Sequence, residues 1–227
     1  MPARKGEGRL DENALIEEIT RRVLAAYHGQ GANGQDPAAL PVGVSVRHVH
    51  ISAADLQVLY GPGHELSLLR DLYQVGEFAA KEVVSLVGPR MRALENVRIL
   101  GPIRGRTQVE VSRTDAVYLG INPPVRASGN LQGSSPITLI GPKGTLVLPE
   151  GVIVANRHIH MSVADAQRFR VADNDLVQVE VLGDKGLVFH NVQVRVKESF
   201  RLEMHLDTDD ANASGITTGA KARILAP

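Results

Sequence analysis

Short apolar runs separated by glycine-containing turns dominate the chain from Pro41 onward. Runs rich in valine, leucine and isoleucine that are bounded by such turns are typical of β-strands. Turns such as Gly141-Pro142-Lys143-Gly144 and Gly183-Asp184-Lys185-Gly186 divide them. The pattern predicts a mainly β fold, built as antiparallel barrels or sandwiches with a few short helices. The expected strands are Val42–Val49, Val83–Val87, Val97–Leu100, Gln108–Val111, Thr138–Ile140, Leu146–Leu148, Val152–Ala155, Val177–Leu182 and Val192–Val196.

Residues 1–40 follow a different pattern. In the segment 11–28, Ile16, Ile19, Val23 and Tyr27 recur at steps of three or four, which predicts an amphipathic helix with one apolar face. A glycine-rich stretch follows and is typical of a flexible linker. The helix either packs on its own domain or lays its apolar face on another protein or another copy of the chain. The long linker favours the second alternative.

The amino-acid composition excludes several kinds of functional site and partner. The 227 residues include eight histidines and no cysteine, which excludes disulfides, thiolate metal sites, iron–sulfur clusters and a thiol nucleophile. Lysine plus arginine number 25, as do aspartate plus glutamate, so the zero net charge gives no electrostatic argument for a nucleic-acid partner. No apolar run approaches the ~18 residues of a membrane span, and no secretory signal is evident. We expect an intracellular protein without a nucleic-acid or membrane partner.

The chain contains an internal repeat. The stretch Arg47–Asp55 recurs 110 residues later as Arg157–Asp165, and Val84–Ala116 recurs 95 residues later as Val179–Ala211. The difference between these offsets places 15 extra residues in the first half, between Gln57 and Glu82. The two halves are therefore expected to be duplicated domains.

The repeat separates the histidines that lie in its matching stretches from the other histidines. Residues two apart on a strand project from the same face, so each His-x-His pair can converge on one metal ion. The 95-residue offset places Glu110 opposite His205, which adds a third ligand-type residue to each half. Three nitrogen or carboxylate ligands with an open fourth position are typical of catalytic zinc. The two predicted ligand sets are His48, His50 and Glu110, and His158, His160 and His205.

Other polar residues receive separate interpretations. Asp55 and Asp165 follow Ser52 and Ser162 in a Ser-x-x-Asp arrangement, which predicts helix capping rather than chemistry. His28, His64 and His190 have no counterpart in the repeat and are interpreted as ordinary surface or core residues. Among the arginines near glycine turns, Arg104 precedes the strand that carries Glu110, and its guanidinium is the strongest candidate to bind phosphate.

These residues resemble a known family, the microcompartment-associated phosphate propanoyltransferases, which are phosphotransacylases of the propanediol-utilisation kind. The resemblance runs from about residue 42 to 220. It rests on Val46–Ser52, Gly76–Glu82, Asn96–Pro102, Gln108–Glu110, Arg157–Ser162 and Glu203–Asn212.

The resemblance implies two similar β-barrel domains with a two-zinc site between them, one barrel taking its first strand from before His48. The expected domains are 47–154 for the first barrel and 41–46 plus 155–227 for the second, after a helix and linker in 1–40. It implies reversible transfer of a short acyl group, typically propanoyl, between coenzyme A and phosphate, with Arg104 holding phosphate. Residues matching the family's coenzyme A site are Gly43, Val44, Ser45, Arg90, Arg98 and Asn212.

Family members also carry a short N-terminal helix that directs them into a bacterial microcompartment, and residues 11–28 fit that description. We therefore expect microcompartment shell or cargo proteins as partners, a location in the microcompartment lumen within the cytoplasm, and a homo-oligomer. The expected mechanism is direct attack of phosphate without a covalent enzyme intermediate. Two alternatives remain open: a di-metal hydrolase of an ester, amide or phosphoester, and a non-catalytic metal-binding scaffold.

Overall fold

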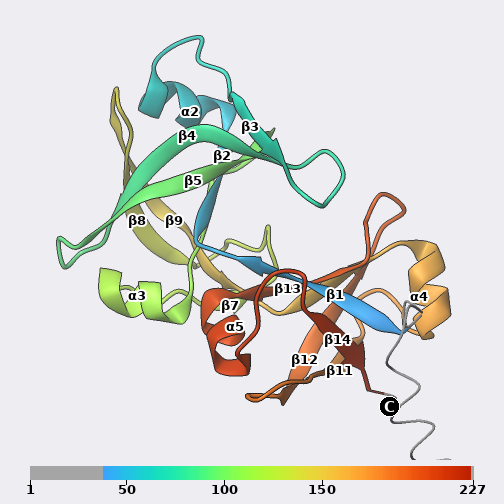
Figure 1. Cartoon of the computed structure of the whole chain (residues 1–227). Coiled ribbons are helices and arrows are strands. Elements are labelled where there is room, and N and C mark those ends of the chain that lie inside the picture. Colours follow the sequence, from blue (N-terminus) through green and yellow to red (C-terminus); the bar gives the residue numbers. More distant parts are fainter. Residues whose placement is uncertain (1–37, 226–227) are drawn as a thin grey trace, which may run out of the picture. The chain divides into compact units, whose positions relative to one another are not determined.

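The computed structural model describes residues 38–225, and the described chain is built mainly of strands (Figure 1). The helix expected over 11–28 lies outside the described residues. The strands are β1 (Ala39–Ser45), β2 (His48–Ser52), β3 (Leu68–Asp71), β4 (Phe78–Val87), β5 (Ala93–Arg104), β6 (Gln108–Glu110), β7 (Val125–Arg126), β8 (Ser135–Ile140), β9 (Thr145–Ala155), β10 (His158–Met161), β11 (Leu176–Val181), β12 (Leu187–Val196), β13 (Glu203–Asp207) and β14 (Lys221–Ile224). The helices are α2 (Ala53–Tyr60), α3 (Arg113–Leu119), α4 (Val163–Phe169) and α5 (Thr208–Ser214).

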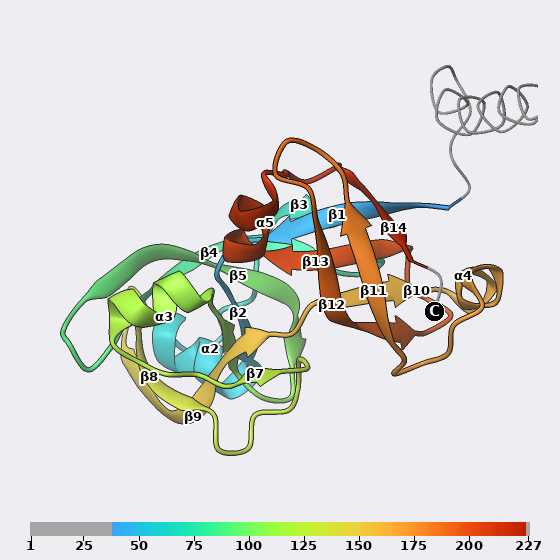
Figure 2. The ribbon, with the colours of Figure 1, turned by 90° about the horizontal axis from the view of Figure 1, so that it is seen from below.

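The strands form two closed barrels of six strands each, which confirms the predicted β-barrel fold (Figure 2). In the first barrel the order is β4-β5-β2-β6-β9-β8, with β8 pairing back onto β4, while β3 and β7 extend the sheet at its edges. The second barrel has the order β1-β13-β10-β12-β11-β14. Each barrel encloses its own cluster of buried aliphatic side chains, around Val49 and Ile99 in the first and Ile159 and Val194 in the second. Burial of these apolar surfaces supplies the main favourable term for each barrel.

Two sequence expectations about the strands are wrong. The run Val42–Val49 is not one strand, because the chain leaves the second barrel after β1 and enters the first at β2, with Val46 exposed between them. The barrels are also not purely antiparallel, since β1 runs parallel to β13, β2 to β5 and β10 to β12. Apolar patterning identifies a strand but carries no information about the direction of its neighbour.

Helices α2 and α4 begin where the Ser-x-x-Asp pattern predicts. The hydroxyl of Ser52 accepts a hydrogen bond from the backbone N–H of Asp55, and that of Ser162 accepts one from the N–H of Asp165. These bonds satisfy donors that the first turn of a helix otherwise leaves free. The Asp165 carboxylate completes a capping box by accepting from the backbone N–H of Ser162. The Asp55 carboxylate instead accepts hydrogen bonds from the hydroxyls of Ser52 and Thr107, so its predicted capping role is met only by its backbone N–H.

One duplicated ion pair links each ligand strand to a helix of the same half. Arg47 forms two contacts of 2.8 and 2.9 Å with the carboxylate of Asp115 at the start of α3. Arg157 makes the equivalent pair of 2.8 Å contacts with Asp210 in α5. Because each arginine directly precedes the first histidine of its strand, these pairs fix the entry of both ligand strands. None of the helices described between residues 38 and 225 is long and apolar enough to cross a membrane.

Candidate metal centre and active-site cavity

The first predicted ligand set assembles on two neighbouring strands. His48 and His50 lie on β2, and Glu110 lies on β6, directly opposite His48 in the antiparallel register. The carboxylate of Glu110 is 3.5 Å from Nε2 of His48 and 3.8 Å from Nε2 of His50. One ligand atom from each of the three side chains lies within 4.8 Å of the others. This spacing suits three ligands around one ion.

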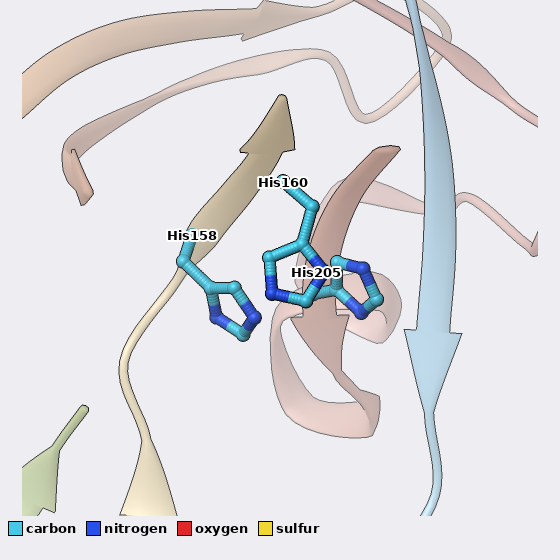
Figure 3. Close-up of side chains that lie close together, drawn as sticks. All are labelled: His158, His160 and His205. Carbon is cyan, nitrogen blue, oxygen red and sulfur yellow. The ribbon is translucent and has the colours of Figure 1, made fainter. Parts of the chain in front are cut away.

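The second set repeats this arrangement with three imidazoles (Figure 3). His158 and His160 lie on β10, and His205 lies on β13, directly opposite His158. The ring of His205 stacks on that of His158 with a centroid distance of 4.9 Å, and its centroid is 4.5 Å from that of His160. Three candidate ligand atoms again lie within 4.8 Å of one another.

The hydrogen bonding of the imidazoles fits a metal ion. The Nδ1 atoms of His48 and His158 lie 2.8 Å from the backbone carbonyls of Val46 and Asn156, so each donates its Nδ1 proton and leaves Nε2 as a free lone pair. Among the described residues, His50, His160 and His205 each keep at least one buried ring nitrogen without a hydrogen-bond partner. A buried polar atom without a partner is costly, and a metal ion would satisfy several of these atoms together.

The electrostatics of the pocket favour the neutral form of three of the imidazoles. Burial lowers the pKa of His50, His158 and His160 well below the ordinary histidine value, and neighbouring histidines lower it further. Neutral imidazole is the form that binds metal ions. These three side chains are therefore available to a cation without competition from protons at neutral pH.

A side chain two positions before the third ligand supports each set. In the first half, Gln108 donates a 2.6 Å hydrogen bond from Nε2 to the carboxylate of Glu110. In the second half the equivalent position is Glu203, whose carboxylate lies 3.2 Å from Nε2 of His205. Gln74, from the segment before β4, reaches this carboxylate with a 3.2 Å hydrogen bond and so ties the first half to the second.

Gly43 leaves space for the side chain of Glu203. It lies on β1 beside His205 in the parallel register, and a Cβ at this position would fall 2.5 Å from Oε1 of Glu203. Any larger residue would therefore displace the Glu203 side chain. The requirement for glycine here follows from close packing rather than from backbone conformation, since Gly43 does not have a positive φ.

Both ligand sets line one cavity of about 540 Å³. Arg104, at the end of β5, also lines it, and its guanidinium lies 3.2 Å from the carboxylate of Glu77 and 3.3 Å from the hydroxyl of Ser128. The cavity thus combines two candidate cation sites with a guanidinium group. That combination can bind an anion and stabilise negative charge that develops during a reaction.

The residues predicted to contact coenzyme A divide into two groups. Gly43, Val44 and Ser45 line the cavity. The other three, Arg90, Arg98 and Asn212, are not among its lining residues. The guanidinium of Arg98 donates hydrogen bonds to the backbone carbonyls of Ala80 and Lys81.

The cavity lining also includes residues that the sequence analysis did not identify, among them Gln74, Arg195 and Glu203. Gln74 lies in the extra segment of the first half and has no counterpart in the repeat. The repeat offered a signal for the other two, because Arg195 aligns with Leu100 and Glu203 aligns with Gln108 on equivalent strands. Of the remaining histidines, His64 stacks on Tyr60 and contacts Glu82, and His190 is exposed. His28 lies outside the described residues.

Comparison with known proteins identifies the family of the chain. The phosphate propanoyltransferase family matches residues 41–217. A phosphate propanoyltransferase of Lachnoclostridium phytofermentans is 51% identical over 214 residues, which cover 94% of this chain and 100% of that protein. The relative from Salmonella typhimurium is 53% identical over 95% of this chain and 99% of its own length, and that from Thermotoga maritima is 55% identical over 78% and 85%. The chain therefore belongs to the phosphate propanoyltransferase family of acyltransferases.

Proposed function

We propose that the protein transfers a short acyl group, typically propanoyl, between coenzyme A and inorganic phosphate in a reversible reaction. This proposal rests on the observation that both groups of three candidate ligands and Arg104 line the same cavity. The names of the relatives, phosphate propanoyltransferase, support the same substrates.

The two ligand sets would hold one zinc ion each, the first with Glu110 as its carboxylate ligand and the second with three imidazoles. When bound, these ions supply Lewis-acid stabilisation of the negative charge that develops on the thioester carbonyl oxygen. The buried, neutral imidazoles and the hydrogen-bonded Glu110 hold the ligand atoms in place before substrate arrives, which lowers the reorganisation required during the reaction.

Arg104 would bind phosphate through its guanidinium fork, with phosphate replacing Glu77 as its anionic partner. Held in this way, one phosphate oxygen attacks the carbonyl carbon of the thioester. A carbon–oxygen bond forms, the carbon–sulfur bond breaks, and its electron pair leaves with the sulfur of coenzyme A as a thiolate. No enzyme nucleophile takes part, in keeping with a chain that has no cysteine.

Coenzyme A would enter along the end of β1, where Gly43, Val44 and Ser45 line the cavity. Arg90, Arg98 and Asn212 lie outside the cavity lining, so their contacts with coenzyme A would involve the parts of the molecule that extend beyond the cavity.

A thiol-release assay tests the reaction. Purified protein of known metal content is mixed with propanoyl-coenzyme A, with and without inorganic phosphate. We expect thiol release that requires phosphate and yields propanoyl phosphate. Release of free propanoate without phosphate would instead indicate a hydrolase, and no release from metal-loaded protein would indicate a binding scaffold.

The role of Arg104 has a separate test. Arg104→Ala removes the charged hydrogen bonds to phosphate, and we expect the phosphate KM to rise about tenfold to a hundredfold. The matched control is Arg106→Ala, which removes a neighbouring exposed arginine that pairs with Glu150. An unchanged phosphate dependence in Arg104→Ala would contradict its assignment.

We also propose that residues 47–154 form one domain and that residues 41–46 plus 155–227 form the other. We propose that the protein is a homo-oligomer.

We further propose that residues 1–40 are a leader whose segment 11–28 targets a microcompartment. This proposal is tested by fusing residues 1–40 to a fluorescent protein in cells that make microcompartments. We expect co-purification with shells, and a diffuse fusion protein absent from purified shells would contradict the proposal. Light scattering measures the oligomeric state.

A further inference from the structure

A second arginine lies beside the metal ligands of the second half. Arg195 is on β12, next to His160 on the parallel strand β10 in the residue register. Residues paired in this way on neighbouring strands project from the same face of the sheet. Arg195 accordingly lines the 540 Å³ cavity together with His160 and Arg104.

Within residues 38–225, the guanidinium of Arg195 forms neither a hydrogen bond nor an ion pair with another side chain or the backbone, although Glu110 and Glu203 line the same cavity. Arg104, by contrast, contacts Glu77. A half-buried charge without a counter-charge is unfavourable, so the folded protein retains a cost at Arg195 that an anion in the cavity would relieve.

The duplication indicates that the barrel does not need an arginine at this position. In the first half, Leu100 on β5 pairs with His50 as Arg195 pairs with His160 in the second half. The same place in the same fold is thus compatible with an apolar side chain. The charge at Arg195 therefore points to a ligand rather than to packing of the strand.

Two guanidinium groups line the same cavity. Arg104 and Arg195 are both lining residues, together with the two candidate ligand sets. A tetrahedral anion with several oxygens is the chemistry that two guanidinium forks and adjacent cation sites recognise.

We propose that Arg195 is a second phosphate-binding residue, which holds the transferred phosphate together with Arg104. This inference rests on the proposed phosphate acyltransferase function. Bound by two guanidinium groups, the phosphate is restrained against rotation and presents one oxygen to the thioester. Coenzyme A also carries phosphate groups, so the test must separate the two sources of phosphate.

The main variant is Arg195→Leu, which gives the second half the residue that the first half has at the equivalent position. We expect the KM for phosphate to rise about tenfold to a hundredfold, while the KM for propanoyl-coenzyme A stays within about twofold. Arg195→Lys keeps the charge but loses the fork, and we expect an intermediate phosphate KM. The control Arg223→Leu removes a half-buried arginine that pairs with Glu180 between β14 and β11 and does not line the cavity, and we expect wild-type kinetics.

Two measurements keep the inference separate from the proposed function. Metal analysis should find the same metal content in Arg195→Leu as in wild type, whereas a loss of metal would make Arg195 a support for the histidines and overturn the proposal. Calorimetric titration of inorganic phosphate into the metal-loaded protein, without acyl-coenzyme A, should show weaker binding in the variant. This readout holds even if the wild type fails the thiol-release assay, which would count against the proposed function alone.

The remaining outcomes are decisive as well. A raised KM for propanoyl-coenzyme A with unchanged phosphate binding would assign Arg195 to the phosphates of coenzyme A and overturn the proposal. Unchanged constants for both substrates would also overturn it. If Arg195→Leu does not fold, as judged by circular dichroism, Arg195→Lys provides the same comparison.

Discussion

The two halves of the candidate metal centre share one scaffold but distribute their charge differently. On β6 of the first half the order is Gln108-Val109-Glu110, with the carboxylate as a candidate ligand and the amide as its support. On β13 of the second half the order is Glu203-Met204-His205, so the carboxylate has the supporting position and the imidazole is the candidate ligand. Each half keeps one carboxylate on this strand, but an ion in the first half would be bound by a negative ligand. The two ions would therefore differ in Lewis acidity although their surroundings are superficially alike.

The largest effect should come from removing one histidine from either half. His50→Ala and His160→Ala each leave two ligands in their own set, and we expect one metal ion per chain instead of two and at least about a hundredfold less thiol release. Metal analysis by mass spectrometry and the thiol assay measure both quantities. His190→Ala, at an exposed histidine outside both sets, serves as control. If either substitution removes both ions, the two halves do not bind metal independently.

Replacing the supporting residues should have a smaller and local effect. Gln108→Ala frees the Glu110 carboxylate, and Glu203→Ala removes the group beside His205, so each should weaken metal binding in its own half by about tenfold to a hundredfold. Competition with a chelator measures the two affinities. Glu203→Gln keeps the size of the side chain and should lose less. Equal weakening of both sites by one substitution would show that the halves are coupled.

The duplicated arginine–carboxylate pairs should differ in stability. The side chain of Asp115 is 7% exposed and that of Asp210 is 18% exposed, so loss of the partner leaves the more buried carboxylate in the first half. We expect Arg47→Met to lower the free energy of unfolding by about 2 kcal/mol and Arg157→Met by about 1 kcal/mol. Urea unfolding measures both, with Arg223→Met, at a half-buried arginine, as control. A larger loss in Arg157→Met would reverse the order.

The smallest effect should arise where the two halves touch. The backbone N–H of Thr114 in α3 donates a 2.8 Å hydrogen bond to the carboxylate of Asp209 in α5, and these two positions are equivalent in the repeat. Asp209→Asn weakens one exposed charged contact, so we expect a loss of about 0.5 kcal/mol in the free energy of unfolding. Thermal unfolding followed by circular dichroism is sensitive enough to detect it. Thiol release by this variant should equal that of wild type.

The features predicted well from the sequence are those that repeat. The His-x-His pairs recur at a fixed offset, and the strand period of two places both rings of each pair on one face. The second offset of the repeat adds Glu110 and His205, so the sequence predicts both groups of candidate ligands that lie together in the structure. The helix starts at Ser52 and Ser162 also follow from local hydrogen bonding. A local pattern is sufficient where the interactions that determine the structure are themselves local.

Features that depend on distant partners could not be predicted in this way. The break between β1 and β2 falls within a continuous apolar run, and only the pairing of β1 with β13 defines it. Gln74 acts on Glu203 across 129 positions of sequence, with no spacing signal to connect them. Arg195 could be compared with Leu100 through the repeat, but its lack of a counter-charge is visible only in three dimensions.

The path of β1 has a consequence for how the protein is made. Of the strands in residues 38–225, β1 is synthesised first, and it pairs with β13, which is among the last. Val42 can therefore pair with Met204 only late in synthesis. The second barrel therefore cannot close before the first has been synthesised, whereas the strands from β2 to β9 contain every partner that the first barrel needs. Synthesis from the N-terminus thus favours an order in which one barrel forms early while an unpaired apolar strand remains exposed until the end. Until then, that strand is an unpaired edge that needs protection from aggregation.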